Sequence, residues 1–83
     1  MRETAIVCNN EHEIQYIYLM LCWEAFPFDL GEDAWYPIYV TQNGKKFKFH
    51  WWQKRDHSQW NNKKYRLVQA KNISKKASED LFN

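Results

Sequence analysis

The dipeptide Asn43-Gly44 constrains the fold of this chain more than any other feature. It lies between two segments in which apolar and polar residues alternate. Asn-Gly between such segments is the strongest short-range sequence signal for a β-hairpin. With Asn43 and Gly44 at the centre of a type I′ turn, Tyr39 is expected to lie opposite Lys48. The sequence therefore predicts an antiparallel strand pair in a defined register.

Side chains alternate between the two faces of a strand pair, so the hairpin sorts its residues into two sets. The apolar set, predicted to form the core, comprises Tyr36, Ile38, Val40, Phe47, Phe49 and Trp51. The second set, which we call the basic-aromatic face, comprises Trp35, Tyr39, Thr41, Lys46, Lys48, His50 and Trp52. We expect a helix to cover the apolar face and to leave the basic-aromatic face open.

The segment that begins at Asn10 predicts this helix. Asn10 is a favourable N-cap residue, and Glu13 follows three residues later, as in a capping box. The helix must end before Pro27, which cannot continue it. Apolar residues recur on one helical face at Ile14, Ile17, Tyr18, Leu21 and Ala25.

The same helix carries a second apolar stripe, which an ordinary surface helix does not need. This stripe comprises Tyr16, Leu19, Met20 and Trp23. Either Phe26, Phe28 and Leu30 fold back over it, or it contacts another chain. We expect the first arrangement, and a homodimer through the stripe is the alternative.

Two further strands are predicted, at residues 4–8 ("TAIVC") and 64–70 ("KYRLVQA"). If Tyr65 and Leu67 point into the core, Lys64 and Arg66 join the basic-aromatic face. Trp60, in the polar connection before the last strand, is expected to pack back onto the domain. The predicted fold is α+β, a single domain of residues 1–83 with one main helix on a three- to four-stranded antiparallel sheet and the Asn-Gly hairpin at its centre.

Charge is distributed unevenly along the chain, although the net charge is only +2. Residues 1–44 contain one basic and seven acidic residues, and residues 45–83 contain eleven basic and three acidic residues. Such asymmetry indicates a polyanionic partner. The alternative is that the two halves fold against each other and the charges mix over the surface.

Basic and aromatic residues on one sheet face are typical of proteins that bind single-stranded nucleic acid. Aromatic rings stack on bases, and Lys and Arg contact the phosphates. We therefore predict binding to RNA or to a ribonucleoprotein. The predicted binding residues are Trp35, Tyr39, Lys46, Lys48, His50, Trp52, Lys54, Arg55, Lys64 and Arg66.

A protein partner is the alternative, because Trp, Tyr and Arg also dominate protein–protein interfaces. The chain would then inhibit a host or defence enzyme without contacting nucleic acid, through the same sheet face or through the second helical stripe. The acidic first half would suit a protein that meets a basic enzyme on one side.

Catalytic, metal and membrane functions have little support in the sequence. No nucleophile elbow, P-loop or zinc pattern occurs, so we expect neither an enzyme nor a cofactor. The acids of the loop Asp29–Asp33 lack the spacing of a calcium loop, and no metal or other role is assigned to them. The longest apolar run, "YIYLMLCW", is much shorter than the ~20 residues that span a bilayer. Without a signal sequence, a cytoplasmic protein is expected, with Cys8 and Cys22 as free thiols.

The order of a strand, the cap "CNNEHE", a helix ending in "CWEAF" and an aromatic hairpin resembles small accessory proteins of tailed bacteriophages. The resemblance covers roughly the first sixty residues. It implies a compact, non-enzymatic inhibitor in the cytoplasm of the infected cell, where it would bind a host enzyme, a nuclease toxin or nucleic acid. It transfers no individual site residue to this chain.

Overall fold

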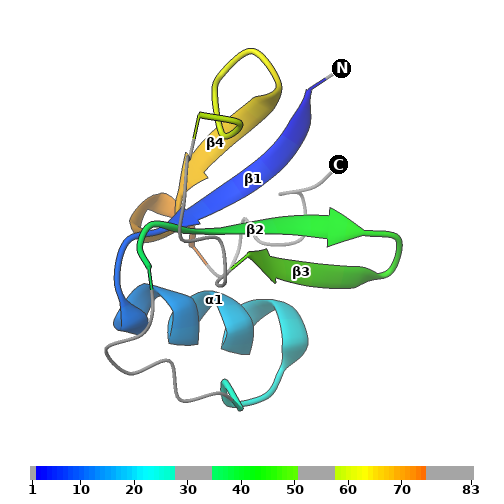
Figure 1. The fold of residues 1–83 in the computed structure, drawn as a ribbon. Helices are drawn as coiled ribbons and strands as arrows, with labels where there is room; N and C mark the ends of the chain where they lie inside the picture. Colours follow the sequence, from blue (N-terminus) through cyan, green and yellow to red (C-terminus); the bar gives the residue numbers. More distant parts are fainter. Residues whose placement is uncertain (1, 28–34, 51–57, 75–83) are drawn as a thin grey trace.

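The computed structural model describes residues 2–27, 35–50 and 58–74. Within them, one helix and a four-stranded sheet form an α+β fold, which confirms the predicted fold class (Figure 1). The strand order is β3-β2-β1-β4, so the N-terminal strand lies in the interior of the sheet. The elements are β1 (Glu3–Cys8), α1 (Glu11–Cys22), β2 (Ile38–Asn43), β3 (Lys46–His50), β4 (Tyr65–Gln69) and the short 3-10 helix η2 (Ala70–Asn72).

The sheet is mixed, so the prediction of a purely antiparallel sheet is wrong. β1 pairs antiparallel with β2 and parallel with β4. The β2–β3 hairpin pairs with one edge of β1, and β4 pairs with the other. β3 is therefore an edge strand, and the prediction of a hairpin at the centre of the sheet is wrong because β1 lies between β2 and β4. β3 and β4 consequently run in the same direction, at the two edges of the sheet.

The hairpin forms where it was predicted, but its register differs by two residues. Gly44 and Lys45 occupy the turn, and Tyr39 pairs with His50 instead of Lys48. Gly44 has a φ of 64°, whereas Lys45 does not adopt a positive φ. A type II′ turn needs a positive φ only at its first central residue, whereas type I′ needs it at both. Because the slip is two residues, the described side chains of the two paired strands, residues 38–43 and 46–50, keep their predicted faces.

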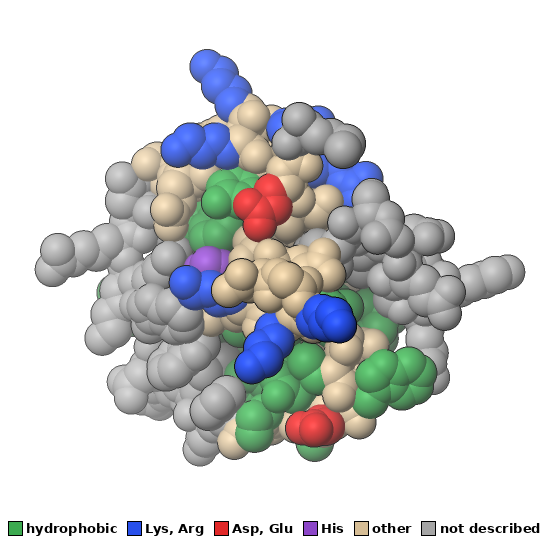
Figure 2. All heavy atoms as spheres, turned by 90° about the vertical axis from the view of Figure 1, so that its right-hand side faces the viewer, with side chains coloured by type: hydrophobic (Ala, Val, Ile, Leu, Met, Phe, Trp, Pro, Cys, Tyr) green, Lys and Arg blue, Asp and Glu red, His purple; other side chains and the backbone are tan. Residues whose placement is uncertain are grey.

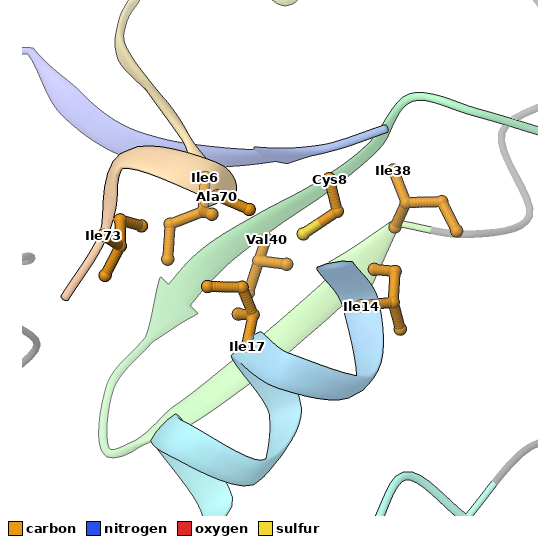
Figure 3. Close-up of a cluster of buried hydrophobic side chains, with 8 residues drawn as sticks. All are labelled: Ile6, Cys8, Ile14, Ile17, Ile38, Val40, Ala70 and Ile73. Carbon is orange, nitrogen blue, oxygen red and sulfur yellow. The ribbon is translucent and has the colours of Figure 1, made fainter. Parts of the chain in front are cut away.

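Helix α1 covers one face of the sheet and closes a core that we call the helix-side core (Figure 3). Ile14 and Ile17 project from α1 and are fully buried. Phe47 and Phe49 of β3 are partly buried against this core, on the predicted face. The helix-side core comprises Ile6, Cys8, Ile14, Ile17, Ile38, Val40, Ala70 and Ile73.

Asn10 caps the helix as predicted. Its Oδ1 accepts a hydrogen bond from the backbone N–H of Glu13 at 2.9 Å. The Glu13 carboxylate accepts one in return from the backbone N–H of Asn9, also at 2.9 Å. Two N–H groups at the start of the helix region are thereby satisfied.

We expect Asn10→Ala to lower the free energy of unfolding by about 1 kcal/mol, because Ala cannot accept the Glu13 N–H. Urea denaturation measures the change. Gln15→Ala is the matched control, since Gln15 is exposed on the same helix and makes no cap. Equal stability of the two variants would contradict the capping role.

The helix ends at Cys22, earlier than Pro27 requires. Trp23 adopts a left-handed backbone conformation, with φ 60° and ψ 23°, and its N–H donates to the carbonyl oxygen of Leu19 at 2.9 Å. Ala25, which was predicted on the buried helical face, lies outside the helix and is exposed. That prediction is therefore wrong, because the left-handed residue redirects the chain before Ala25.

Candidate functional site

The sheet face opposite α1 is covered, so the prediction of an open basic-aromatic face is wrong. The Trp60 ring stacks on the Tyr39 ring, with centroids 4.4 Å apart and planes at 7°. It also contacts His50 at 4.8 Å and Tyr65 at 4.7 Å between centroids. Trp60 is 6% exposed and Tyr39 is 7% exposed, so neither ring is available to stack on a base.

Trp60 reaches this face because it lies in the connection between two parallel strands. Its burial confirms the prediction that it packs back onto the domain. The Trp60-side cluster consists of Ala5, Val7, Tyr39 and Trp60, with Tyr65 and Leu67 packed against it. The sheet thus has apolar contacts on both faces, from α1 on one side and from Trp60 on the other.

The faces of β4 are the reverse of those predicted. Tyr65 and Leu67 pack against the Trp60-side cluster, whereas Val68 packs against the helix-side core. Side chains alternate along β4, so Arg66 shares the face of Val68. The parallel pairing sets this arrangement, since Val68 lies beside Ile6 of β1. Arg66 therefore lies on the opposite face of the sheet from the β3 lysines and does not join them.

The lysines of β3 are exposed on the face opposite α1, as predicted. Lys46 and Lys48 alternate there with the partly buried Phe47 and Phe49. Figure 2 shows Lys and Arg side chains over the middle and upper parts of the molecule, next to hydrophobic side chains in both its lower and its upper part. Lys64 is exposed in the turn before β4.

Of the remaining predicted binding residues, the structure describes Trp35. Trp35 is 49% exposed but precedes β2, which begins at Ile38, and so is not part of the described sheet. Trp52, Lys54, Arg55 and the acidic loop Asp29–Asp33 lie outside the described residues.

His50 is half-buried between the sheet and Trp60. Its Nε2 lies 2.9 Å from the hydroxyl oxygen of Thr41, and its ring meets the Trp60 ring edge-on at 69°. Burial, and after it the neighbouring charge of Lys48, lower the pKa of His50 to about 4. The imidazole is therefore neutral near pH 7.

We expect the free energy of unfolding to fall as the pH decreases from about 6.5 towards 4. In this range His50 binds a proton in the unfolded chain but stays neutral in the folded chain, so protonation favours the unfolded state. The full pKa difference corresponds to about 3 kcal/mol. Solvent reaches the half-buried ring and reduces this to about 1–2 kcal/mol.

Urea denaturation of the native chain and of His50→Gln at several pH values within this window measures the effect. The other titrating groups contribute to both proteins, so the difference between the two profiles isolates His50. Identical pH profiles would show that His50 is not kept neutral by the fold.

Helix α1 exposes a line of apolar side chains that we call the outer stripe, namely Tyr16, Leu19 and Trp23. They are 39%, 55% and 82% exposed, respectively. The Tyr16 hydroxyl donates a hydrogen bond to the carbonyl oxygen of Ile73 at 2.9 Å, which fixes one end of the stripe. Met20, predicted as a fourth member, is instead half-buried against the helix-side core.

The predicted covering of this stripe is not observed. Phe26 packs against Tyr18 and Phe49, with ring centroids 5.1 Å and 6.3 Å away, and thus joins the helix-side core. Phe28 and Leu30 lie outside the described residues. Phe26 thus does not cover the outer stripe, and Tyr16, Leu19 and Trp23 are exposed.

Trp23 combines exposure with an unfavourable backbone conformation. A left-handed conformation costs a non-glycine residue roughly 1–2 kcal/mol, and a bulky residue there is uncommon. With its ring 82% exposed, Trp23 gains little from burial in return. The sequence signal that could have indicated this is that neither Gly nor Asn occurs between Cys22 and Pro27.

Other chemistry is limited in the part of the chain that the structure describes. No group of three His, Cys, Asp or Glu residues there is placed to hold a metal ion. No helix within these residues has the length and hydropathy needed to cross a bilayer. Cys8 and Cys22 are free, as predicted, and burial raises the pKa of the Cys8 thiol to about 12.

Neither a protein-family model nor a curated protein nor a solved structure matches this chain. Its function is therefore inferred from the two surfaces described above, the outer stripe of α1 and the lysines of β3.

Proposed function

We propose that this chain is a non-catalytic binding protein that inhibits a protein partner through the outer stripe of α1. The observation that carries the proposal is Trp23, which is 82% exposed in a conformation that costs the fold energy. Backbone strain of this kind is concentrated at functional positions. Trp is also the residue type most enriched among the residues that dominate protein–protein binding energy.

The neighbouring side chains support Trp23 as the anchor of an interface. Leu19 is one turn before it and more than half exposed, and Tyr16 continues the same line. The hydrogen bond from Tyr16 to Ile73 holds that ring in place before binding. A partner therefore meets a largely pre-organised surface, which reduces the conformational entropy that binding costs.

Two further features favour inhibition over catalysis. His50 lies under Trp60 and bonds to Thr41, so it is not presented to a substrate. The resemblance to phage accessory proteins favours a host or defence enzyme as the partner. The inhibitor would act by occupying a surface of that enzyme.

RNA binding is the second candidate, and the exposed Lys46 and Lys48 of β3 favour it. Tyr39 and Trp60 are stacked on each other and buried, which leaves this surface without their rings for base stacking. An RNA contact here would therefore be made mainly to phosphates, with weak sequence preference and strong salt dependence.

We expect Trp23→Gly to keep the melting temperature or to raise it by a few degrees, because glycine adopts the left-handed conformation without steric cost. Thermal unfolding followed by circular dichroism measures this. A clear drop would mean that the indole stabilises the fold, and would remove the argument that the residue serves binding.

The proposal is tested by capture from a bacterial lysate, with and without RNase. The tagged baits are the native chain, Trp23→Gly, and a double variant with Lys46→Glu and Lys48→Glu. We expect one protein at a fixed stoichiometry, captured by the native chain and by the lysine variant after RNase, and lost with Trp23→Gly. Capture by Trp23→Gly at the native level would contradict the proposal. RNA that co-purifies with the native chain and is lost only in the lysine variant would establish the second candidate.

A further inference from the structure

The charges around Trp23 define the chemistry of the partner. We infer that the outer stripe binds a cationic protein surface, with an Arg or Lys side chain placed over the Trp23 indole and beside the Glu24 carboxylate. This inference rests on the proposed function, because it names the partner of the same surface. It concerns the C-terminal end of α1, where Trp23 and Glu24 lie.

The sequence around α1 is acidic throughout. No Lys or Arg occurs between Glu3 and Gly44. Glu24 follows Trp23 and is exposed. The pKa of the Cys22 thiol is raised first by burial of the thiol and second by the negative charge of the Glu24 carboxylate. The last turn of α1 contains no basic residue, and this end of a helix carries a partial negative charge.

Two lysines of the sheet lie on the face away from α1, whereas Arg66 shares the face that α1 covers. Lys46 and Lys48 project from the face opposite α1. In Figure 2 an acidic side chain lies among the hydrophobic ones in the lower part of the molecule, where Figure 1 places α1. Lys71 lies in η2, and Ile73, which follows η2, accepts the hydrogen bond from Tyr16. Lys71 is therefore near the Tyr16 end of the outer stripe and not near Trp23.

An exposed indole and an exposed carboxylate on adjacent residues are suited to a cation. The face of a Trp ring attracts an ammonium or guanidinium group that lies within about 6 Å of its centroid. A carboxylate beside it forms charge-assisted hydrogen bonds with the same group. Arg uses both contacts best, because its planar guanidinium can stack and donate at the same time.

A second copy of this chain fits the outer stripe less well. In a parallel pairing of two α1 helices the same ends of the two copies meet. Packed parallel, they would bring the two Glu24 side chains together. Like charges across an interface oppose association. Glu24 beside the outer stripe therefore favours a basic partner over a second copy of the chain in this parallel arrangement.

The test uses two synthetic peptides with the same short apolar segment, one flanked by Arg and the other by Glu. The reporter is the indole N–H resonance of Trp23, identified among the five Trp signals by its absence from the spectrum of Trp23→Gly. We expect the Arg peptide to shift this resonance and the Glu peptide to leave it unchanged. Glu24→Gln should weaken the Arg peptide about threefold.

Glu3→Gln is the matched control, since Glu3 is an exposed acid on β1, away from α1. It should leave the affinity for the Arg peptide unchanged. Raising the salt concentration to about 0.5 M should weaken binding to the native chain more than binding to Glu24→Gln.

Several results would overturn the inference. The first is that the Glu peptide shifts the indole N–H resonance of Trp23 as strongly as the Arg peptide does. The second is that neither peptide shifts this resonance. Equal affinity of the native chain and Glu24→Gln would also reject it. A Trp23 shift that depends on protein concentration alone would identify a second copy as the occupant.

The lysate experiment separates this inference from the proposed function. Capture that is lost with Trp23→Gly but insensitive to Glu24→Gln and to salt would retain the proposed function and reject a cationic partner. Capture that does not depend on Trp23 would reject the proposed function itself, whatever the peptides do.

Discussion

Replacing Trp60 with alanine is expected to lower the free energy of unfolding by about 3–5 kcal/mol. The ring is 6% exposed and contacts Tyr39, His50 and Tyr65, which come from three different strands. Its removal opens a cavity over the face opposite α1 and exposes Tyr39. Domains of this size are stable by only about 5–15 kcal/mol, so the variant should lose a large part of its stability.

Trp35→Ala is the matched control, because Trp35 is the same residue type at 49% exposure. Urea denaturation of both variants measures the difference, and equal losses would show that Trp60 does not cover the sheet. If Trp60→Ala does not fold, Trp60→Phe keeps part of the contact and should give a smaller loss. In the folded Phe variant the pKa of His50, followed by NMR, should rise from about 4 towards its ordinary value, because the ring is less buried.

Replacing Ile17 with alanine is expected to cost about 2–5 kcal/mol. Ile17 is fully buried in the helix-side core, where α1 meets the aliphatic side chains of β1 and β2 (Figure 3). Alanine leaves a cavity at this contact, and little of it can close because the strands on the other side are fixed by the sheet. The result should be a lower urea midpoint with an unchanged slope.

Leu19→Ala is the matched control for Ile17→Ala. Leu19 lies two residues later on the same helix and is 55% exposed, so its truncation should change stability by less than about 0.5 kcal/mol. A loss at Leu19 as large as that at Ile17 would mean that the buried and exposed faces of α1 are reversed. If Ile17→Ala is unfolded, Ile17→Val should still fold and lose about 0.5–1.5 kcal/mol.

Local patterns predicted the elements that depend on neighbouring residues. The alternation around Asn43-Gly44 assigned Tyr39, Lys46 and Lys48 to one face and Phe49 to the other, and both assignments hold. The cap at Asn10 was also identified, because its partner Glu13 is only three residues away. Such contacts are decided within one turn of chain, so the sequence contains the information directly.

Long-range pairing could not be predicted in the same way. Glu3 pairs with Tyr65, and nothing in either segment specifies a parallel partner. The orientation of β4 then reversed its predicted faces, which moved Arg66 away from the lysines. The two-residue error at the hairpin has a different cause, because Gly44 suits the turn in either register.

The candidate site was only partly visible in the sequence. The excess of apolar residues on the helix indicated a second stripe, and Tyr16, Leu19 and Trp23 are indeed exposed. Met20 could not be excluded from it, because the flexible methionine side chain reaches the core from an intermediate position. The left-handed conformation of Trp23 depends on the path of the chain after the helix, which local propensity does not define.

The interior position of β1 has a consequence for how the chain folds. β1 precedes the other described strands in the sequence, yet one of its two neighbours is β4, which follows all of them, and the pairing joins Glu3 with the distant Tyr65. A high contact order of this kind slows folding, because the entropy of closing a long loop is lost before the contact forms. A nascent chain that has not yet reached β4 leaves one edge of β1 unpaired, so this four-stranded sheet is complete only after β4 has been synthesised.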